Sequence, residues 1–284
     1  MIDAKVRLMM MSFENGRSNK SRLYEHSLAL LEKRLKQFNR KRFNIVFMAD
    51  SWYGDGNASD NIFIASLEKA AQYNPLFIVH GGDIVFTGST NRLINFVEAI
   101  EETIPEIPLF VVVGNHEEDG VDGPTLNYEE IIGPLHYKLD IPKMNFSLIA
   151  LNNIRYRLDE SELEFLKDSL AYSFGRTLVS MHIPPRAGKW AGSDHTFITG
   201  MHKFFKIIGD KVSRVLVSHI HAYATDIIKG NKFILSGGAG AELDKGQINH
   251  IVLFKFRGSE ILHKRIAIGD PPFPPVTSGH TPAD

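Results

Sequence analysis

Side chains able to bind metal ions recur in five short segments, and each follows an apolar run of the kind that forms a buried strand. The segments are Asp50-Ser-Trp52, Gly81-Gly82-Asp83, Gly114-Asn115-His116-Glu117, His182-Ile-Pro-Pro185 and Ser218-His219-Ile220-His221. In open α/β sheets the ligand site lies beyond the carboxyl ends of the strands, so we expect these segments to meet at one edge. Carboxylate, imidazole and carboxamide groups are all metal ligands, and the chemistry indicated is that of a metal centre.

Each segment taken alone has an ordinary structural explanation. An Asp after a strand commonly forms a turn, because its carboxylate accepts nearby backbone N–H groups. A His at the end of an apolar run is more often a hydrogen-bonded core residue than a ligand. His219 and His221 are two residues apart, so they converge on one site only if the backbone turns there. The prediction of a single site therefore depends on five coincidences at five strand ends.

The elements that must position these side chains follow from hydrophobic periodicity. The expected strands are 44–49, 76–80, 109–113, 145–151, 177–181, 214–217, 232–235, 250–256 and 260–266, and the expected helices are 61–73, 90–103, 160–173 and 199–209. Phe256-Arg-Gly-Ser-Glu260 predicts a hairpin turn, which closes the sheet with antiparallel strands. Alternating elements followed by strands predict a mixed α/β domain.

A further helix is expected over residues 21–42, where apolar residues repeat at helical spacing and cations gather in the second half. One interpretation is a helix that binds a partner or a membrane surface. The other, which we favour, is a helix packed on its own domain, its cations placed near the negative end of the helix dipole. We divide the chain into an N-terminal extension (1–42), a main domain (43–268) and a Pro-rich tail (269–284).

Composition limits the classes of function. The 284 residues carry a formal net charge of -1, which gives no global bias toward nucleic acid or anionic membranes. The chain has no cysteine, so any metal must be held by His, Asp, Glu or Asn. No apolar run approaches the roughly 20 residues that span a bilayer. We favour a cytoplasmic location; an exported mature domain, with a signal removed before this numbering, stays open, as does the oligomeric state.

The ordered set of segments resembles the calcineurin-like metallophosphoesterases, a superfamily that includes the purple acid phosphatases. Their signature runs D-x-H, G-D-x-x, G-N-H-[DE], H and G-H-x-H, and the match here spans Asp50 to His221. The resemblance implies an αββα sandwich, in which two packed mixed β-sheets are flanked by helices. It also implies cleavage of phosphomonoesters or phosphodiesters by a metal-bound hydroxide. We expect a small phosphoester substrate and no nucleic-acid partner.

The resemblance implies a role for each matching residue. Asp83 would bridge two divalent or trivalent ions (Mn, Fe, Zn or Ni). Asp50 and His221 would bind the first ion. Asn115, His182 and His219 would bind the second, with Asn115 also near the substrate. His116 would serve the leaving-group oxygen as proton donor or hydrogen-bond partner. Past His182, Arg186 is a candidate to pair with the substrate phosphate, and a solvated surface loop is the equal alternative. An acid at Glu117 is expected only to orient His116.

The first motif departs from the family pattern. Trp52 stands where the family has His, and an indole N–H is a donor that cannot bind a metal. The first site is therefore expected to be weaker than the second, unless Tyr53, Asp55 or Asp60 fills the gap. Trp52 favours one alternative function, a non-catalytic metal-binding scaffold of the same fold. A nuclease is the other alternative, which the balanced charge disfavours.

Overall fold

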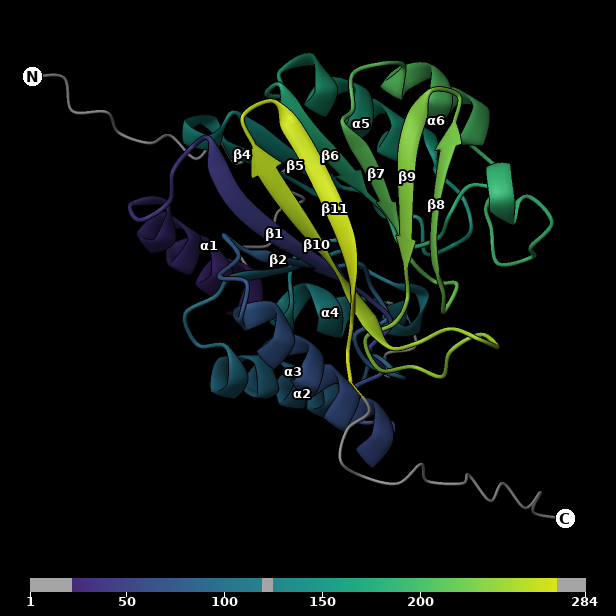
Figure 1. Ribbon diagram of the computed structural model, residues 1–284. Coiled ribbons are helices and arrows are strands. Elements are labelled where there is room, and N and C mark those ends of the chain that lie inside the picture. Colours follow the sequence, from purple (N-terminus) through teal and green to yellow (C-terminus); the bar gives the residue numbers. More distant parts are fainter. Residues whose placement is uncertain (1–21, 119–124, 270–284) are drawn as a thin grey trace, which may run out of the picture.

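The computed structural model describes residues 22–118 and 125–269 (Figure 1). Parts of two expected segments, residues 1–21 of the N-terminal extension and 270–284 of the Pro-rich tail, lie outside the described residues. Within the described ranges, none of the helices combines the length and the apolar character that crossing a membrane requires.

Two β-sheets form the centre of the molecule. The first has the order β11 (Glu260–Ala267), β10 (His250–Arg257), β1 (Arg42–Met48), β2 (Ile78–His80) and β3 (Leu109–Val111). The second has the order β4 (Tyr137–Ile141), β5 (Phe146–Ala150), β6 (Arg176–Ser180), β7 (Arg214–Val217), β9 (Asn231–Ser236) and β8 (Tyr223–Ile228). In the first sheet β1, β2 and β3 are parallel, with β3 at one edge, and β10 and β11 are antiparallel at the other. In the second sheet β5, β6, β7 and β9 are parallel, and the edge strands β4 and β8 are antiparallel. The expected hairpin is present, because Arg257 pairs with Glu260 across the β10–β11 turn.

Helices cover the outer face of each sheet. The first sheet packs on α2 (Asn57–Ala71), α3 (Thr90–Thr103) and α4 (Leu126–Ile131), and the second on α5 (Glu160–Ala171) and α6 (Met201–Ile208). A third apolar core lies between the sheets and includes Phe47, Phe146 and Phe254, all fully buried. Figure 1 shows the helices on opposite sides of the paired sheets. The predicted αββα sandwich is confirmed.

The helix α1 (Arg22–Leu35) packs on this domain. Leu28 and Leu31 join the core between the sheets, and the Ser27 hydroxyl donates a hydrogen bond of 2.8 Å to the Leu109 carbonyl. The helix ends at Leu35, before the expected end at residue 42, because the chain turns there to enter β1. In that turn the Asn39 side chain accepts the backbone N–H of residue 41 at 2.8 Å.

Other boundaries lie close to the expected ones, and three of the described α-helices and strands were not expected. Strand β7 and helix α3 have the bounds that the sequence predicts. Helix α2 begins four residues before the expected start at residue 61. The unexpected elements are α4, β4 and β8.

Candidate metal centre

The carboxyl ends of five parallel strands from the two sheets supply the candidate residues. Strands β1, β2 and β3 lead to Asp50, Asp83 and Asn115, and strands β6 and β7 lead to His182 and His219. The two sheets run their parallel strands toward this one edge. Ligand sites form where such ends meet, because the side chains that follow the strands face a shared crevice.

Left-handed backbone conformations aim these side chains. Asp50, Asp83 and His219 have φ angles of 59°, 52° and 70°, in a region that residues other than glycine rarely adopt. Such strain persists only where the surrounding structure fixes it, and it gathers at functional sites. At His219 it supplies the turn by which two histidines spaced two apart reach the same site. Gly114 is required by close approach, since a Cβ there would lie 2.2 Å from Oδ1 of Asp83.

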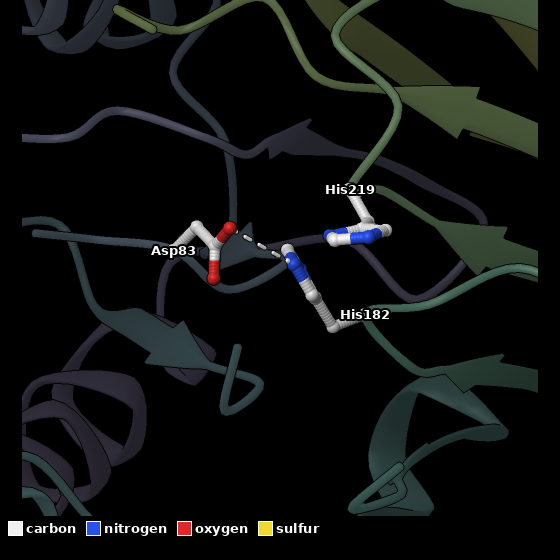
Figure 2. Close-up of side chains that lie close together, drawn as sticks. All are labelled: Asp83, His182 and His219. Atoms are coloured by element: carbon white, nitrogen blue, oxygen red, sulfur yellow. Dashed lines mark ion pairs between the residues drawn. The ribbon is translucent and has the colours of Figure 1, made fainter. Parts of the chain in front are cut away.

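Asp83, His182 and His219 form the tightest group, with one metal-binding atom from each lying within 4.8 Å of the others (Figure 2). Nδ1 of His182 lies 2.8 Å from the Gly81 carbonyl, which only accepts, so Nδ1 carries the proton. The lone pair of Nε2 then faces Oδ2 of Asp83 at 3.2 Å. Two lone pairs at this distance require a proton or a cation between them.

Asp50 and His221 form a second pair beside the first group. Nε2 of His221 lies 3.5 Å from Oδ1 of Asp50, and Nδ1 donates to the Glu242 carbonyl at 2.6 Å. The other carboxylate oxygen of Asp50 accepts the backbone N–H of His219 at 3.2 Å. Both residues therefore present one metal-binding atom whose direction a backbone contact fixes.

Four buried acceptor atoms in this region lack a hydrogen-bond partner among the described residues: Oδ1 of Asp50, Oδ2 of Asp83, Oδ1 of Asn115 and Nε2 of His182. Buried polar atoms are almost always paired, so a group of unpaired acceptors needs an explanation. A proton on Nε2 of His182 can pair that atom with Asp83, but it leaves the carbonyl oxygen of Asn115 and Oδ1 of Asp50 without a hydrogen bond, whereas a cation satisfies all four acceptors. The donor set therefore fits transition-metal ions.

The pKa values of the site residues show that buried carboxylates at this site stabilise positive charge on their neighbours. Burial raises the pKa of Asp83, but the neighbouring His182 and His116 outweigh it and hold that pKa below its usual value. Burial lowers the pKa of His182 and Asp83 raises it, to about 9. The pKa of His221 also rises to about 9 because Asp50 outweighs the burial of the ring. Burial and the charge of His182 lower the pKa of His219 to about 3.

His116 and Glu117 have separate tasks. Nδ1 of His116 lies 2.6 Å from the Phe86 carbonyl, and Nε2 lies 3.9 Å from Oδ2 of Asp83 with the side chain 23% exposed. The buried Glu117 carboxylate accepts the backbone N–H groups of Asp83, Ile84 and Gly114 at 3.0, 2.9 and 2.7 Å. Glu117 therefore ties two loops together, and the expectation that it orients the His116 ring is wrong: Phe86 does this.

Trp52 packs beside His116 and beside His221, one of the candidate ligands of the first ion. Its ring centroid is 4.9 Å from that of His116 and 5.0 Å from that of His221, and its buried Nε1 has no acceptor among the described residues. None of the three proposed substitutes takes over the role of the missing His. The Asp60 carboxylate accepts the Gly54 N–H at 2.6 Å, the Tyr53 ring packs on Phe63, and Asp55 is exposed.

Arg186 is held within its own loop. Its Nε donates to the Thr196 hydroxyl at 2.9 Å and its NH2 lies 3.2 Å from the Asp194 carboxylate. None of its described hydrogen bonds or ion pairs reaches a candidate metal ligand. The same loop reaches the site through His195, whose ring centroid lies 5.4 Å from that of His219.

Tyr156 is a site residue that sequence reasoning missed. Its hydroxyl oxygen lies 2.7 Å from Nε2 of His219, and its backbone has a φ of 57°. Burial and the charge of Asp83 raise its pKa, so the hydroxyl keeps its proton at neutral pH. No motif marks this position, because Tyr156 lies in an irregular loop after β5.

Comparisons with known proteins point to one family. The family model for calcineurin-like phosphoesterases matches residues 43–223, a range that includes every candidate metal ligand. A search of curated protein sequences gives no match.

Several solved structures share the fold. A purple acid phosphatase from yellow lupin (Lupinus luteus) seeds superposes with a TM-score of 0.64 at 15% identity, over 81% of this chain and 52% of the lupin chain. GAP50, described as the anchor in the inner membrane complex of Plasmodium, gives 0.55 at 14% identity, over 80% of this chain and 85% of its own. A putative 5'-nucleotidase from Staphylococcus aureus gives 0.53 at 13% identity, over 79% and 54%. This chain thus spans about half the length of the lupin protein.

Proposed function

Because this chain belongs to the calcineurin-like phosphoesterase family, we propose that it is a metal-dependent hydrolase of small phosphomonoesters or phosphodiesters. The observation that carries this proposal is the group of four buried acceptor atoms without partners, which come from four separate strand ends. A protein that used the fold only as a scaffold would gain nothing from burying such atoms unpaired, since each costs free energy.

We assign two ion sites to these residues. Asp83, Asn115, His182 and His219 would hold the second ion. Asp83 would share the first ion with Asp50 and His221, whose pairing at 3.5 Å supports this grouping. When bound, Mn, Fe, Zn or Ni ions polarise the phosphoryl oxygens and supply an activated water at neutral pH.

The side chains around these sites orient the substrate and handle its proton. The Phe86 carbonyl holds Nδ1 of His116, so Nε2 is the nitrogen presented to a leaving-group oxygen. His116 is the proton donor in our proposal. Arg186 binds the substrate phosphate after leaving Asp194; this exchange costs little because the Asp194 side chain is 99% exposed and such surface pairs are weak.

Hydrolysis of nitrophenyl monoesters and diesters tests the proposal. Metal-free protein resupplied with Mn, Fe, Zn or Ni is expected to hydrolyse at least one ester. Asn115→Ala and His116→Ala should lose most of this activity while keeping the wild-type circular dichroism. His202→Ala, an exposed residue of α6, is the matched control and should retain full activity. Activity unchanged in both site variants would exclude this site.

A non-catalytic metal-binding scaffold is the second candidate, and Trp52 is the observation that favours it. The indole stands beside His221, where the family has a metal-binding His. GAP50, which shares the fold, is described as an anchor. Metal binding with no hydrolysis of any ester under the whole metal panel would decide for the scaffold. A nuclease is tested in the same panel with short DNA, and cleavage of DNA would revive that alternative.

A further inference from the structure

A basic cavity lies at the end of the sandwich opposite the candidate metal centre. It has a volume of about 340 Å³, and four cationic side chains contribute to its wall: Arg40, Lys41, Lys143 and Arg176. None of the described residues that line it is acidic. A volume of this size falls within the range of small-molecule sites, so one small ligand fits.

Arg176 forms the buried part of this wall. Its guanidinium donates to the carbonyls of Gly258 and Arg40 at 3.2 and 3.1 Å, and also to that of Met144. Only 9% of the residue is exposed. Carbonyl oxygens satisfy the N–H groups but leave the positive charge without a counter-charge. No carboxylate pairs with Arg176 among the described residues.

The cations at the mouth of the cavity are also uncompensated. Arg40 and Lys41 are exposed, and neither side chain has a hydrogen bond or an ion pair within the described ranges. Lys143 reaches the carbonyl of Leu35 at the end of α1. Four positive charges around one concavity attract an anion, and a guanidinium with lysines nearby suits phosphate oxygens.

This cavity is separate from the metal centre. Arg40 and Lys41 precede β1, and Asp50 follows it. The strand has seven residues, which separate the two places by roughly 20 Å at about 3.3 Å per residue. Strand β6 repeats this arrangement: Arg176 begins the strand, and His182 follows its other end.

We propose that this cavity binds a small ligand carrying two or more phosphate groups, at a site distinct from the metal centre. A polyphosphate anion fits better than a single phosphate because four cations surround the cavity. The cations of the segment after α1 then serve this cavity, rather than a helix lying on a membrane.

Calorimetric titration of the full chain with methylenebisphosphonate, which resists hydrolysis, tests the proposal. Replacing Arg176 would risk the fold, so the variant reverses the two exposed cations, Arg40→Glu with Lys41→Glu. We expect it to weaken binding about tenfold or more, because both charges lie within a Debye length of the ligand. Lys167→Glu on α5 is the matched surface control and should change the affinity less than about twofold.

A His219→Ala variant separates this site from the metal centre, and bisphosphonate binding should survive in it. Binding that disappears in His219→Ala, or that ignores the reversal of Arg40 and Lys41, overturns the proposal. Phosphatidic acid in phosphatidylcholine vesicles provides a second arm: it carries a single phosphate on a lipid, so retention that depends on Arg40 and Lys41 would assign these cations to a membrane surface and overturn the small-ligand proposal. Tighter binding of a single-stranded DNA oligonucleotide than of the bisphosphonate would instead make this end a nucleic-acid surface and overturn the small-ligand proposal.

Discussion

The hydroxyl oxygen of Tyr156 lies 2.7 Å from Nε2 of His219 and decides which nitrogen of that imidazole remains for a metal ion. A neutral imidazole has one N–H and one lone pair. The hydroxyl can donate to Nε2 or accept from it, and an ion on Nδ1 requires the tautomer in which Nε2–H donates to the hydroxyl oxygen. Contacts of this kind fix the tautomer and the orientation of metal-binding histidines. Tyr156 is therefore a positioning residue for the second ion site.

Tyr156→Phe is expected to weaken metal binding by roughly ten- to a hundredfold, because His219 loses the contact that orients it. Titration of the metal-free chain with Mn, followed by calorimetry, measures this change. Tyr172→Phe, at a side chain that is 75% exposed, is the control and should bind metal like the wild type. An unchanged metal affinity in Tyr156→Phe would show that the hydroxyl has no positioning role.

Trp52→His is expected to strengthen the first ion site. The indole lies 5.0 Å from the ring of His221, so a His at this position can direct a lone pair into the same space. Metal content after dialysis should rise toward two ions per chain in Trp52→His and stay at the wild-type value in Trp52→Phe, which removes the indole without adding a ligand. Two equally tight sites in the wild type would contradict the predicted asymmetry.

The sequence predicts most of the fold because its central strands are apolar runs with clear ends. Strand β4 was missed although its buried residues alternate regularly: Tyr137, Leu139 and Ile141 face the core and the two residues between them do not. Strand β8 carries no such signal, because it is an edge strand in which only the last residue is fully buried. Helix α4 has six residues, too few for a periodic pattern.

The sequence also predicts that the candidate ligands meet at one edge, since each of them lies within four residues of the end of a strand. It does not predict which side chains hold the ligands in place. Tyr156 reaches His219 across 63 positions, and Glu117 reaches backbone groups 34 positions away. Arg186 is a further example: its place after His182 suggests substrate contact, but the sequence does not predict that Thr196 and Asp194 hold its guanidinium until a substrate binds. Which side chain holds which ligand depends on how segments far apart in the sequence pack together.

Gly81→Ala is expected to destabilise the fold. A Cβ at residue 81 would lie 2.1 Å from the Ser218 hydroxyl oxygen and 2.9 Å from the ring of Phe47, so the neighbours must move. Overpacking of this kind costs about 1–3 kcal/mol in the free energy of unfolding. Urea unfolding of the metal-free chain measures it, and Gly192→Ala is the control because no atom lies within 4 Å of the added Cβ.

Ser218 stands where the family signature has Gly, and this explains why the contact with Gly81 is so close. Ser218→Gly in the Gly81→Ala background should therefore recover part of the lost stability, leaving the cost of the contact with Phe47. A double-mutant cycle isolates the coupling between the two positions. If the two substitutions have additive effects, the Ser218 hydroxyl does not limit the space at residue 81.

His80→Gln is expected to reduce the amount by which the free energy of unfolding falls as the pH is lowered. The His80 ring is fully buried, its Nδ1 accepts the Gly82 N–H at 3.3 Å, and its Nε2 faces the Ser51 hydroxyl at 3.1 Å, so it is held neutral. Burial, together with the charge of His182, lowers its pKa from 6.5 to about 3. Between these pH values His80 is therefore protonated in the unfolded chain and neutral in the folded chain.

The stability that neutral His80 provides is complete above pH 6.5, where folded and unfolded chains bind the same protons, and it falls as the pH drops toward about 3. At about pH 5 the loss is about 2 kcal/mol in the free energy of unfolding. Urea unfolding of the metal-free wild type and His80→Gln at about pH 7.5 and about pH 5 should show their difference shift by this amount in favour of the variant. His202→Gln, on the exposed face of α6, should track the wild type. A wild-type–variant difference that is the same at both pH values would mean that the folded chain protonates His80 as readily as the unfolded chain does.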